Sequence, residues 1–405
     1  MSRLVLKFGG TSLVDSACIA HVAELIAVEH AGGHELAVVV SAAAGDTDRL
    51  IAEAQTFAAE PDPVAVDLLL ATGEQASVAR LVLALAVRGV AAEPFTGARA
   101  GIFTDGVAGK ARIVRMECGR IANALGDHKV AVVAGFQGVD ANGAVTTLGR
   151  GGSDTTAVAL AAALDAEECR IYTDVEGIFS ADPRLEPAAR RLDRVHCEEM
   201  LELAGLGSKV LVIESVDYAA QHAVPLRVFS TFAEGPGTAV RHESDPGAPP
   251  VIGIASSAAE AELAAIGLPA RPGLAAALIA PLAAAGVAVD TILQNEPRSG
   301  RSDVSFSVPR RDLAQARAIL SREAGRLGAE RLVEDATVAK VSLVGRGLRS
   351  NAPLLARALG ALEREGIAVR IIVANETRLS AIIPESDLQR AVHALHVEFG
   401  LDASA

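Results

Sequence analysis

Runs of residues without a polar side chain alternate with helix-like stretches through the first half of the chain. Leu36–Val40 (LAVVV) and Val130–Phe136 (VAVVAGF) are two such runs. A strand with no polar face is buried on both faces, which is typical of parallel sheets covered by helices. We expect further strands at Arg3–Phe8 and Cys169–Thr173, and a helix at Ser16–His30. The alternation predicts an α/β fold with a mostly parallel sheet sandwiched by helices.

Polar and small residues follow the predicted strands where each strand ends. They occupy Gly9–Ser12, Ser41–Asp48, Gly135–Gly138 and Thr173-Asp174. In folds of this class, ligands bind beyond the carboxyl ends of the parallel strands. The sequence therefore predicts a ligand site at this edge of the sheet.

The strongest single signal for a ligand is a glycine-rich stretch, Thr146–Thr156 (TTLGRGGSDTT), followed by a helical run, Ala157–Leu164. Glycines allow a ligand to approach the backbone N–H groups closely. Ser153–Thr156 are all competent helix N-caps, and the start of a helix favours an anion. Arg150 adds a bidentate donor for a carboxylate or a phosphate. The stretch predicts an anion-binding loop.

Lysine is scarce in this chain, and two lysines stand beside glycine turns. Lys7 ends an apolar strand just before Gly9-Gly10, and Lys209 follows Gly205–Ser208. A compact ammonium group in such a place suits a phosphate. Both lysines are therefore candidate phosphate ligands.

Two acidic residues are candidates for the same site. Glu74 lies in Thr72-Gly73-Glu74, which we expect to interrupt a helical stretch from Val64 to Arg88, and its carboxylate could receive a substrate ammonium group. Asp174 directly follows a predicted buried strand.

Composition excludes several classes of function. The net charge of −13 argues against a general binder of nucleic acid, and four widely spaced cysteines give no zinc or disulfide pattern. The chain has no G-x-x-x-x-G-K-[ST] and no G-x-G-x-x-G motif, against a P-loop or a dinucleotide-binding fold. Arg80 and Arg88 interrupt the apolar run Val78–Ala92, which predicts a buried helix and no membrane span. We expect a cytoplasmic protein.

The composition of the chain changes near residue 234. Glu234–Pro250 has the Pro, Gly and charge content of a linker, and a weak repeat with an offset of about 80 residues follows it. Each copy predicts a βαββαβ unit of the ferredoxin-like type. The predicted organisation is a catalytic domain over residues 1–233, a linker over 234–250, and two modules over 251–330 and 331–405, between which strands can be exchanged.

Three motifs resemble those of the aspartokinases, members of the amino-acid kinase superfamily, over essentially the full chain. They are Lys7–Ser12 (KFGGTS), Val145–Arg184 and Glu198–Lys209 (EEMLELAGLGSK). The two C-terminal modules are similar to the tandem ACT domains of that family. The resemblance implies the amino-acid kinase fold followed by two ACT modules. It also implies transfer of the γ-phosphoryl group of ATP, with Mg²⁺, to the β-carboxylate of L-aspartate.

The resemblance also implies roles for individual residues. The implied catalytic residues are Lys7, Arg150, Asp174 and Lys209. The implied ATP-binding residues are Lys7, Phe8, Gly9, Gly10, Thr11, Ser12, Thr173, Asp174, Phe179, Arg184, Lys209 and Val210. The implied aspartate-binding residues are Ser41, Thr47, Glu74, Arg150, Gly151, Gly152, Ser153 and Asp154. No protein side chain is implied as a metal ligand.

The resemblance implies lysine or threonine as effectors at the ACT modules. The implied effector residues are Arg271, Pro272, Gly273, Ile292, Gln294, Asn295, Asn375 and Glu376. The family's D-x-P-G loop reads Ala270-Arg271-Pro272-Gly273 here, without the carboxylate for an effector ammonium group. Feedback inhibition is therefore expected to be weakened or altered. Paired ACT modules also imply a homo-oligomer.

Two substitutions in the catalytic motifs keep alternatives open. The family's S-A-M-G-D-T-T-D loop reads Ser41–Asp48 (SAAAGDTD) here, and Phe179 replaces a usual tyrosine. One alternative is a kinase for another acidic amino acid in a specialised pathway. A second is a non-catalytic ACT-domain sensor, and a dinucleotide-dependent oxidoreductase is a distant third.

Overall fold

The computed structural model describes residues 2–207, 210–243, 247, 249–297 and 299–402. The chain forms two compact units. The first unit comprises residues 1–178, 191–205 and 209–246, and the second comprises 179–190, 206–208 and 247–405. Each unit is discontinuous in sequence, whereas the predicted domains follow one another along the chain.

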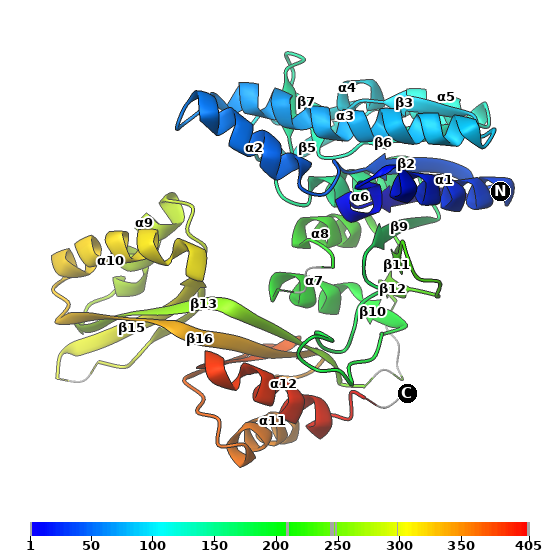
Figure 1. Ribbon diagram of the computed structural model, residues 1–405. Helices are drawn as coiled ribbons and strands as arrows, with labels where there is room; N and C mark the ends of the chain where they lie inside the picture. Colours follow the sequence, from blue (N-terminus) through cyan, green and yellow to red (C-terminus); the bar gives the residue numbers. More distant parts are fainter. Residues whose placement is uncertain (1, 208–209, 244–246, 248, 298, 403–405) are drawn as a thin grey trace. The chain divides into compact units, whose positions relative to one another are not determined.

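An eight-stranded sheet in the order β10-β12-β11-β9-β1-β2-β6-β3 forms the centre of the first unit (Figure 1). Neighbouring strands from β11 to β3 are parallel, and β12 is antiparallel to β11. The prediction of a mostly parallel sheet is thus confirmed. The strands are β1 (Arg3–Phe8), β2 (Glu35–Val40), β3 (Ala92–Phe95), β6 (Val130–Ala134), β9 (Glu168–Thr173), β10 (Arg194–His196), β11 (Leu226–Ser230) and β12 (Thr238–Arg241).

Helices cover both faces of this sheet. The helices are α1 (Ser16–Ala31), α2 (Asp46–Phe57), α3 (Pro63–Val87), α4 (Gly97–Ala100), α5 (Gly119–Gly126), α6 (Gly152–Ala163), α7 (Cys197–Gly205) and α8 (Ile213–His222), with a short 3₁₀ helix at Gly10–Leu13. Leu4, Leu6 and Phe8 of β1 pack into one hydrophobic core with Ile26 of α1 and Leu81 of α3. Successive side chains of a strand point to opposite faces, so Val5 and Lys7 lie on the other face, where α6 packs.

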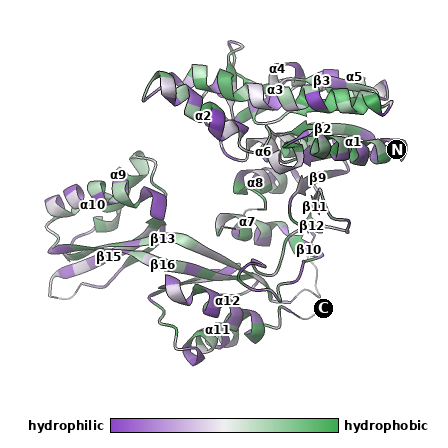
Figure 2. Ribbon diagram, in the orientation of Figure 1, coloured by the Kyte–Doolittle hydropathy of each residue, from purple (hydrophilic) through white to green (hydrophobic). Residues whose placement is uncertain are grey.

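Helix α3 is continuous, so the predicted interruption at Thr72-Gly73-Glu74 is wrong. Gly73 lies within the helix. A glycine is needed at this position because α3 passes very close to the loop after β2: a Cβ on Gly73 would lie 2.8 Å from the Cβ of Ala42. By length and composition α3 could cross a membrane, and much of its length is green in Figure 2. Its buried face, however, packs on the sheet and carries Asp67 and Glu74, as expected of a core helix.

A small sheet in the order β5-β4-β7-β8 stands beside the large one in the first unit. Its strands are β4 (Ile102–Thr104), β5 (Ile113–Met116), β7 (Gln137–Val139) and β8 (Val145–Thr147). The last residue of β8, Thr147, leads directly into the glycine-rich stretch. The small sheet therefore delivers this stretch to the edge of the large sheet.

Strand β12 lies inside the range that composition marks as a linker. It pairs with both β11 and β10, so residues 238–241 belong to the sheet of the first unit. Pro236 and Gly237 form the turn between β11 and β12, and Gly237 has a φ of +65°, which favours glycine. A turn inside a domain and a linker between domains thus have the same local composition.

The second unit contains a six-stranded antiparallel sheet in the order β14-β15-β13-β16-β18-β17. Its strands are β13 (Val251–Pro269), β14 (Asp290–Gln294), β15 (Arg301–Pro309), β16 (Arg331–Gly345), β17 (Ile371–Ala374) and β18 (Arg378–Pro384). Strand β13 pairs with β16 along its length, as in Ile254 with Leu343. The second half of β13 also pairs with β15, as in Leu263 with Phe306, and the second half of β16 also pairs with β18. Strands β13 and β16 are therefore shared by both halves of the sheet.

Each half of the second unit has its own helix pair and its own core. Helices α9 (Leu274–Ala284) and α10 (Leu313–Leu327) pack around Leu263 and Phe306. Helices α11 (Ala352–Arg364) and α12 (Leu388–Glu398) pack around Ile254 and Leu343. Short 3₁₀ helices, Arg310–Asp312 and Glu385–Asp387, precede α10 and α12.

Candidate active site

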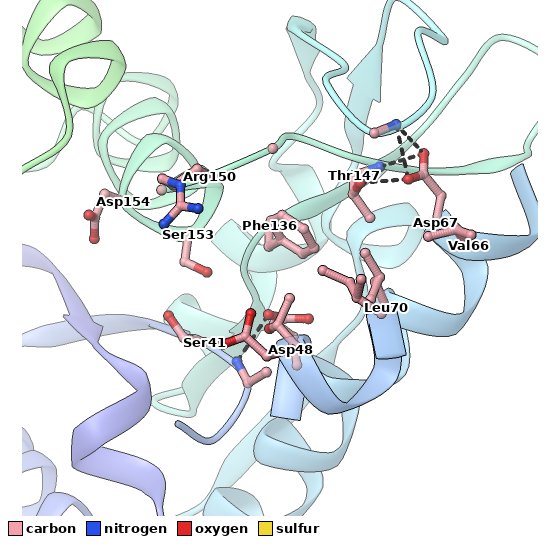
Figure 3. A pocket seen from close by; sticks show the side chains of 18 of the residues that line it. Ser41, Asp48, Val66, Asp67, Leu70, Phe136, Thr147, Arg150, Ser153 and Asp154 are labelled. Carbon is pink, nitrogen blue, oxygen red and sulfur yellow. Dashed lines mark hydrogen bonds between the residues drawn. The ribbon is translucent and has the colours of Figure 1, made fainter. Parts of the chain in front are cut away.

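A cavity of about 640 Å³ opens in the first unit at the carboxyl ends of β1 and β2. It collects Lys7 and every residue implied for aspartate binding, although these come from four separate segments. The lining residues are Lys7, Ser41, Ala42, Thr47, Asp48, Ile51, Pro61, Pro63, Val66, Asp67, Leu70, Glu74, Gly109, Phe136, Thr147 and Gly149–Asp154. Figure 3 shows Arg150 and Ser153 on one side of the cavity and Leu70 of α3 on the other, with Phe136 between them.

The glycine-rich stretch forms the turn that starts α6. The N-cap residue is Gly151, with a φ of +73° and no side-chain cap, so the prediction of Ser153–Thr156 as caps is wrong. These four residues lie inside the first turns of the helix, and the hydroxyl of Thr156 donates to the carbonyl of Gly152 at 2.7 Å. Two of the first three N–H groups of the helix already donate within this turn, that of Gly152 to the carbonyl of Gly149 and that of Asp154 to the carbonyl of Gly151, at 3.0 Å each. The N–H of Ser153 donates to no acceptor among the described residues and is available to an anion in the cavity.

An ion pair joins β1 to the start of α6. The Nζ atom of Lys7 lies 2.5 Å from Oδ1 of Asp154, and both side chains are largely buried. A Cβ on Gly9 would lie 3.6 Å from the same Nζ atom. The ammonium group of Lys7 is therefore held at the cavity wall by Asp154, beside backbone that carries no side chain.

Glu74 lines the cavity and carries a buried carboxylate. Its Oε1 accepts a hydrogen bond from the backbone N–H of Ala42 at 3.0 Å, whereas its Oε2 is buried and has no hydrogen-bond partner among the described residues. Only 3% of the residue is exposed. Burial raises the pKa of Glu74 to about 7, opposed by the hydrogen bond from Ala42. A buried oxygen without a partner is costly, and a donor on a ligand would satisfy it.

The loop after β2 is held close to β1 by a glycine. A Cβ on Gly10 would lie 2.7 Å from the carbonyl oxygen of Ala42, so a side chain there would push the loop away. The loop ends at Gly45, whose φ of +86° starts α2, and it places Thr47 and Asp48 at the cavity. The altered sequence of this loop therefore still delivers Ser41 and Thr47 to the cavity.

Asp48, Asp67, Phe136 and Thr147 are among the lining residues that the sequence did not identify individually. All but Asp67 lie in segments that the sequence placed at this edge of the sheet. Asp67 stands two helical turns before Glu74, and two carboxylates at this spacing share one face of a helix. That spacing in an otherwise apolar helix was a usable signal. Phe136 has a φ of +65°, which is unusual for a non-glycine residue and is not visible in the sequence.

The residues implied for ATP binding do not all belong to the first unit. Phe8–Ser12, Thr173, Asp174 and Val210 belong to the first unit, whereas Phe179 and Arg184 belong to the second. Arg184 is exposed and pairs with Asp182 at 2.6 Å. Lys209 lies outside the described residues. The nucleotide roles of all these residues stay predictions.

The residues implied for effector binding lie in both halves of the second unit. Ile292 and Gln294 are exposed on β14, and Gly273 is the N-cap of α9 with a φ of +83°. Glu376 follows β17 and pairs with Arg349 at 3.1 Å. The remaining members, Arg271, Pro272, Asn295 and Asn375, lie on the neighbouring loops. Their effector roles stay predictions.

Comparisons with known proteins agree with this architecture. The amino acid kinase family matches residues 2–230, and an ACT domain family matches residues 341–399. An aspartokinase of Pseudomonas aeruginosa is 46% identical over 100% of this chain and 99% of its own length. An aspartokinase of Mycolicibacterium smegmatis is 42% identical, covering 99% of this chain and 97% of its own.

Solved structures are similar as well. The crystal structure of Escherichia coli aspartokinase III in complex with aspartate and ADP has a TM-score of 0.83 and 25% identity, covering 98% of this chain and 99% of that one. The same enzyme in complex with lysine and aspartate has a TM-score of 0.79 and 26% identity, with the same coverage. The chain belongs to the amino acid kinase family and, within it, to the aspartokinases.

Proposed function

We propose that the protein is an aspartate kinase. It transfers the γ-phosphoryl group of ATP to the β-carboxylate of L-aspartate and forms 4-phospho-L-aspartate, the first intermediate of the aspartate-family amino acids. The observation that carries this proposal is the cavity itself, which combines Arg150 with the unpartnered buried oxygen of Glu74. The acceptor of such a cavity carries both an acid group and an amine.

Arg150 and Glu74 recognise opposite ends of the acceptor. The guanidinium of Arg150 is exposed at the cavity and has no ion-pair partner in the part of the chain that the structure describes, so it is available for a bidentate bond to a carboxylate. The Oε2 atom of Glu74 accepts from the ammonium group. These two contacts fix the amino acid and leave its second carboxylate directed to the transferring phosphate.

Phosphoryl transfer to a carboxylate needs little proton chemistry, because the acceptor is already ionised at neutral pH. The enzyme must place the two anionic reactants in line and offset their charge. Lys7 and the N-terminus of α6, where the N–H of Ser153 has no acceptor among the described residues, supply positive potential at the cavity wall. Asp154 keeps the ammonium group of Lys7 in place between turnovers.

We propose that ATP enters with Mg²⁺. No cluster of three or more His, Cys, Asp or Glu side chains suited to a metal ion occurs among the described residues. This fits Mg²⁺, which is usually held by phosphate oxygens, water and one or two carboxylates. When bound, the ion offsets charge on the phosphates. Thr173, Asp174, Phe179, Arg184 and Lys209 are the proposed nucleotide residues.

We also propose amino-acid effectors at the ACT modules of the second unit and a cytoplasmic homo-oligomer. Lysine is present in a complex of the similar Escherichia coli enzyme. In this chain the loop Ala270–Gly273 lacks a carboxylate, and Glu376 already pairs with Arg349. These features support weak or altered feedback.

An ADP-release assay tests the function directly. L-aspartate is compared with L-glutamate as acceptor, with lysine and threonine added separately and together. Turnover with aspartate and flat inhibition curves are expected. Absence of turnover with aspartate would overturn the proposed activity, and tight inhibition at low effector concentration would overturn the proposed weak feedback.

A further inference from the structure

Asp67 is a buried acidic residue of α3 that lines the cavity. Its exposed fraction is 0%, and no Lys, Arg or His of the described residues forms an ion pair with it. A buried carboxylate without a cation requires hydrogen-bond donors in its place. A buried carboxylate beside the proposed acceptor, which itself carries two carboxylates, is unfavourable unless it has a specific role.

Three donor groups surround the carboxylate of Asp67. The backbone N–H of Gly109 donates to both oxygens, at 3.0 Å each. Thr147 donates twice, through its backbone N–H to Oδ2 at 3.0 Å and through its hydroxyl to Oδ1 at 2.6 Å. Figure 3 shows these bonds between Asp67 and Thr147. One side chain of α3 thus holds two separate segments of the small sheet.

These two segments support the loop that carries Arg150. The backbone N–H of Ala111 donates to the carbonyl of Thr147 at 2.9 Å, so the turn at Gly109 and the end of β8 are also joined to each other. Gly149 packs on this turn, since a Cβ there would lie 3.3 Å from the carbonyl oxygen of Gly109. The loop leaves this anchored point one residue before Arg150.

A second anchor stands on the opposite side of the same loop. The backbone N–H of Leu148 donates to the carbonyl of Phe136 at 2.9 Å. Gly152 is tightly enclosed, since its Cβ would lie 2.7 Å from the Cβ of Leu148. Between the two anchors, Gly149 and Gly151 have positive φ angles of +75° and +73°. Two permissive glycines around Arg150 would allow several loop conformations, and the anchors select one.

We propose that Asp67 is a positioning residue for Arg150 and thereby sets the affinity of the enzyme for its amino-acid acceptor. This rests on the proposed function, in which Arg150 binds an acceptor carboxylate. Asp67 does not touch the acceptor. It holds Thr147 and Gly109, and these fix the path of the loop.

The inference explains why the residue is an aspartate. All three neighbouring groups are donors, so both oxygens must accept. An asparagine at this position would direct an amide N–H₂ group at Thr147 or Gly109, leaving a buried donor opposite a buried donor. Because displacement of a binding group by about 1 Å can reduce activity by about 100-fold, a small shift of the loop is enough to be measured.

Four variants test the proposal. Asp67→Asn reverses part of the donor pattern, and Thr147→Val removes one donor but keeps the shape of the side chain. Thr147→Ser keeps the hydroxyl and is the matched control. Asp140→Asn changes a half-buried carboxylate that accepts only from the β7–β8 turn, at the other end of β8.

The measurements are the KM values for both substrates, kcat, and hydrogen exchange of the backbone at residues 147–152. We expect Asp67→Asn and Thr147→Val to raise the KM for aspartate by about tenfold or more, with the KM for ATP changed less than about twofold. Hydrogen exchange of this segment should be faster in both. Thr147→Ser should recover most of the effect seen in Thr147→Val, and Asp140→Asn should resemble the wild type. Thr147→Val keeps the test informative if Asp67→Asn does not fold.

Two outcomes would overturn the inference. One is a fall in kcat and thermal stability with an unchanged KM for aspartate, which indicates a purely structural role. The other is unchanged hydrogen exchange at residues 147–152. Failure of the proposed function is distinct, because it appears as a wild-type enzyme without turnover on aspartate, while the exchange experiment still tests whether Asp67 anchors the loop.

Discussion

At the scale of single residues, the site depends on charged groups that the fold keeps partly unsatisfied. Glu74 has one oxygen bonded to the loop after β2 and one buried without a hydrogen-bond partner among the described residues. Arg150 stands on a loop fixed by its neighbours and has no partner of its own among the described side chains. The Oε2 atom of Glu74 and the guanidinium of Arg150 are available to a ligand because neither has a hydrogen-bond or ion-pair partner among the described residues.

Glu74 should make acceptor binding depend on pH. Its pKa is raised by burial to about 7, so at lower pH a larger fraction is protonated and cannot accept from an ammonium group. The KM for aspartate should therefore fall as the pH rises through about 7, and Glu74→Gln should abolish this dependence while raising the KM at high pH. A titration of KM against pH for both enzymes tests this, and an identical slope in the variant would contradict it.

The same pKa shift has a consequence for stability. A carboxyl group whose folded pKa is raised is protonated in the native state at a pH where it is ionised in the unfolded state. Stability is therefore lost as the pH rises from about 4.5 to about 7, by at most about 3 kcal/mol. In thermal unfolding of the free enzyme, the Tm of Glu74→Gln should rise relative to that of the wild type as the pH increases over this interval. A constant difference would contradict the assignment.

Arg150 should not be replaceable by lysine. A lysine in its place keeps the charge but loses the planar pair of donors, so Arg150→Lys should raise the KM for aspartate by about 10-fold to 100-fold and change the KM for ATP little. Arg120→Lys, at an exposed position of α5, is the matched control. Equal KM values for aspartate in the Arg150 variant and the wild type would exclude a bidentate role.

At the scale of elements, close approach between α3 and the loop after β2 shapes the cavity. Gly73 makes this approach possible, and the same loop rests on Gly10 from the other side. The loop is thus confined between a helix and the end of β1. Its sequence can vary, as it does here, while Ser41 and Thr47 still reach the cavity.

Gly73→Ala should destabilise the protein although alanine favours helices. The gain in helix propensity is about 1 kcal/mol, whereas the new Cβ would meet Ala42 at 2.8 Å and cost about 1 to 3 kcal/mol. A lower Tm and a higher KM for aspartate are expected. Gly126→Ala in α5, with no atom within 4 Å of the added Cβ, should not lower the Tm. Equal Tm values for the two variants would show that the close approach of Gly73 to Ala42 does not limit stability.

At the scale of the whole molecule, the two units are interleaved along the chain. Residues 179–190 lie between two segments of the first unit but belong to the second. There the hydroxyl of Ser180 contacts Nε2 of His396 at 3.0 Å, and Glu186 pairs with His393 of α12 at 2.7 Å. Folding of residues 179–190 thus requires the main part of the second unit, which begins only at residue 247.

Truncation should therefore not release an intact first unit. In a chain ending at Pro246, residues 179–190 lose their contacts with α12 and β13, and buried residues such as Ser180 and Ala181 become exposed. Trypsin should cleave after Arg184 or Arg190 at least about tenfold faster than in the full chain, since local unfolding controls cleavage. Equal cleavage rates would show that the segment folds without the second unit.

Local patterns predicted the bounds of several elements of the first unit. Strands β1, β2 and β9 and helix α1 lie within one residue of their expected bounds, because each mainly apolar run is closed by a polar or glycine-containing segment. The same reasoning failed where the decisive neighbour is distant in sequence. Gly73 was interpreted as a break because Ala42 was not visible beside it, and Ser153–Thr156 were interpreted as caps because a bare glycine cap leaves no side-chain signal.

The fold class, the family, and the residue types needed at the site could be predicted from the sequence, because they follow from periodicity and from motifs within short segments. Only the tertiary structure decided that Glu74 keeps one free oxygen, that Asp67 anchors the Arg150 loop, and that residues 179–190 belong with α12. Each of these is a contact between residues far apart along the chain. Burial and hydrogen bonding depend on those contacts, and local sequence does not record them.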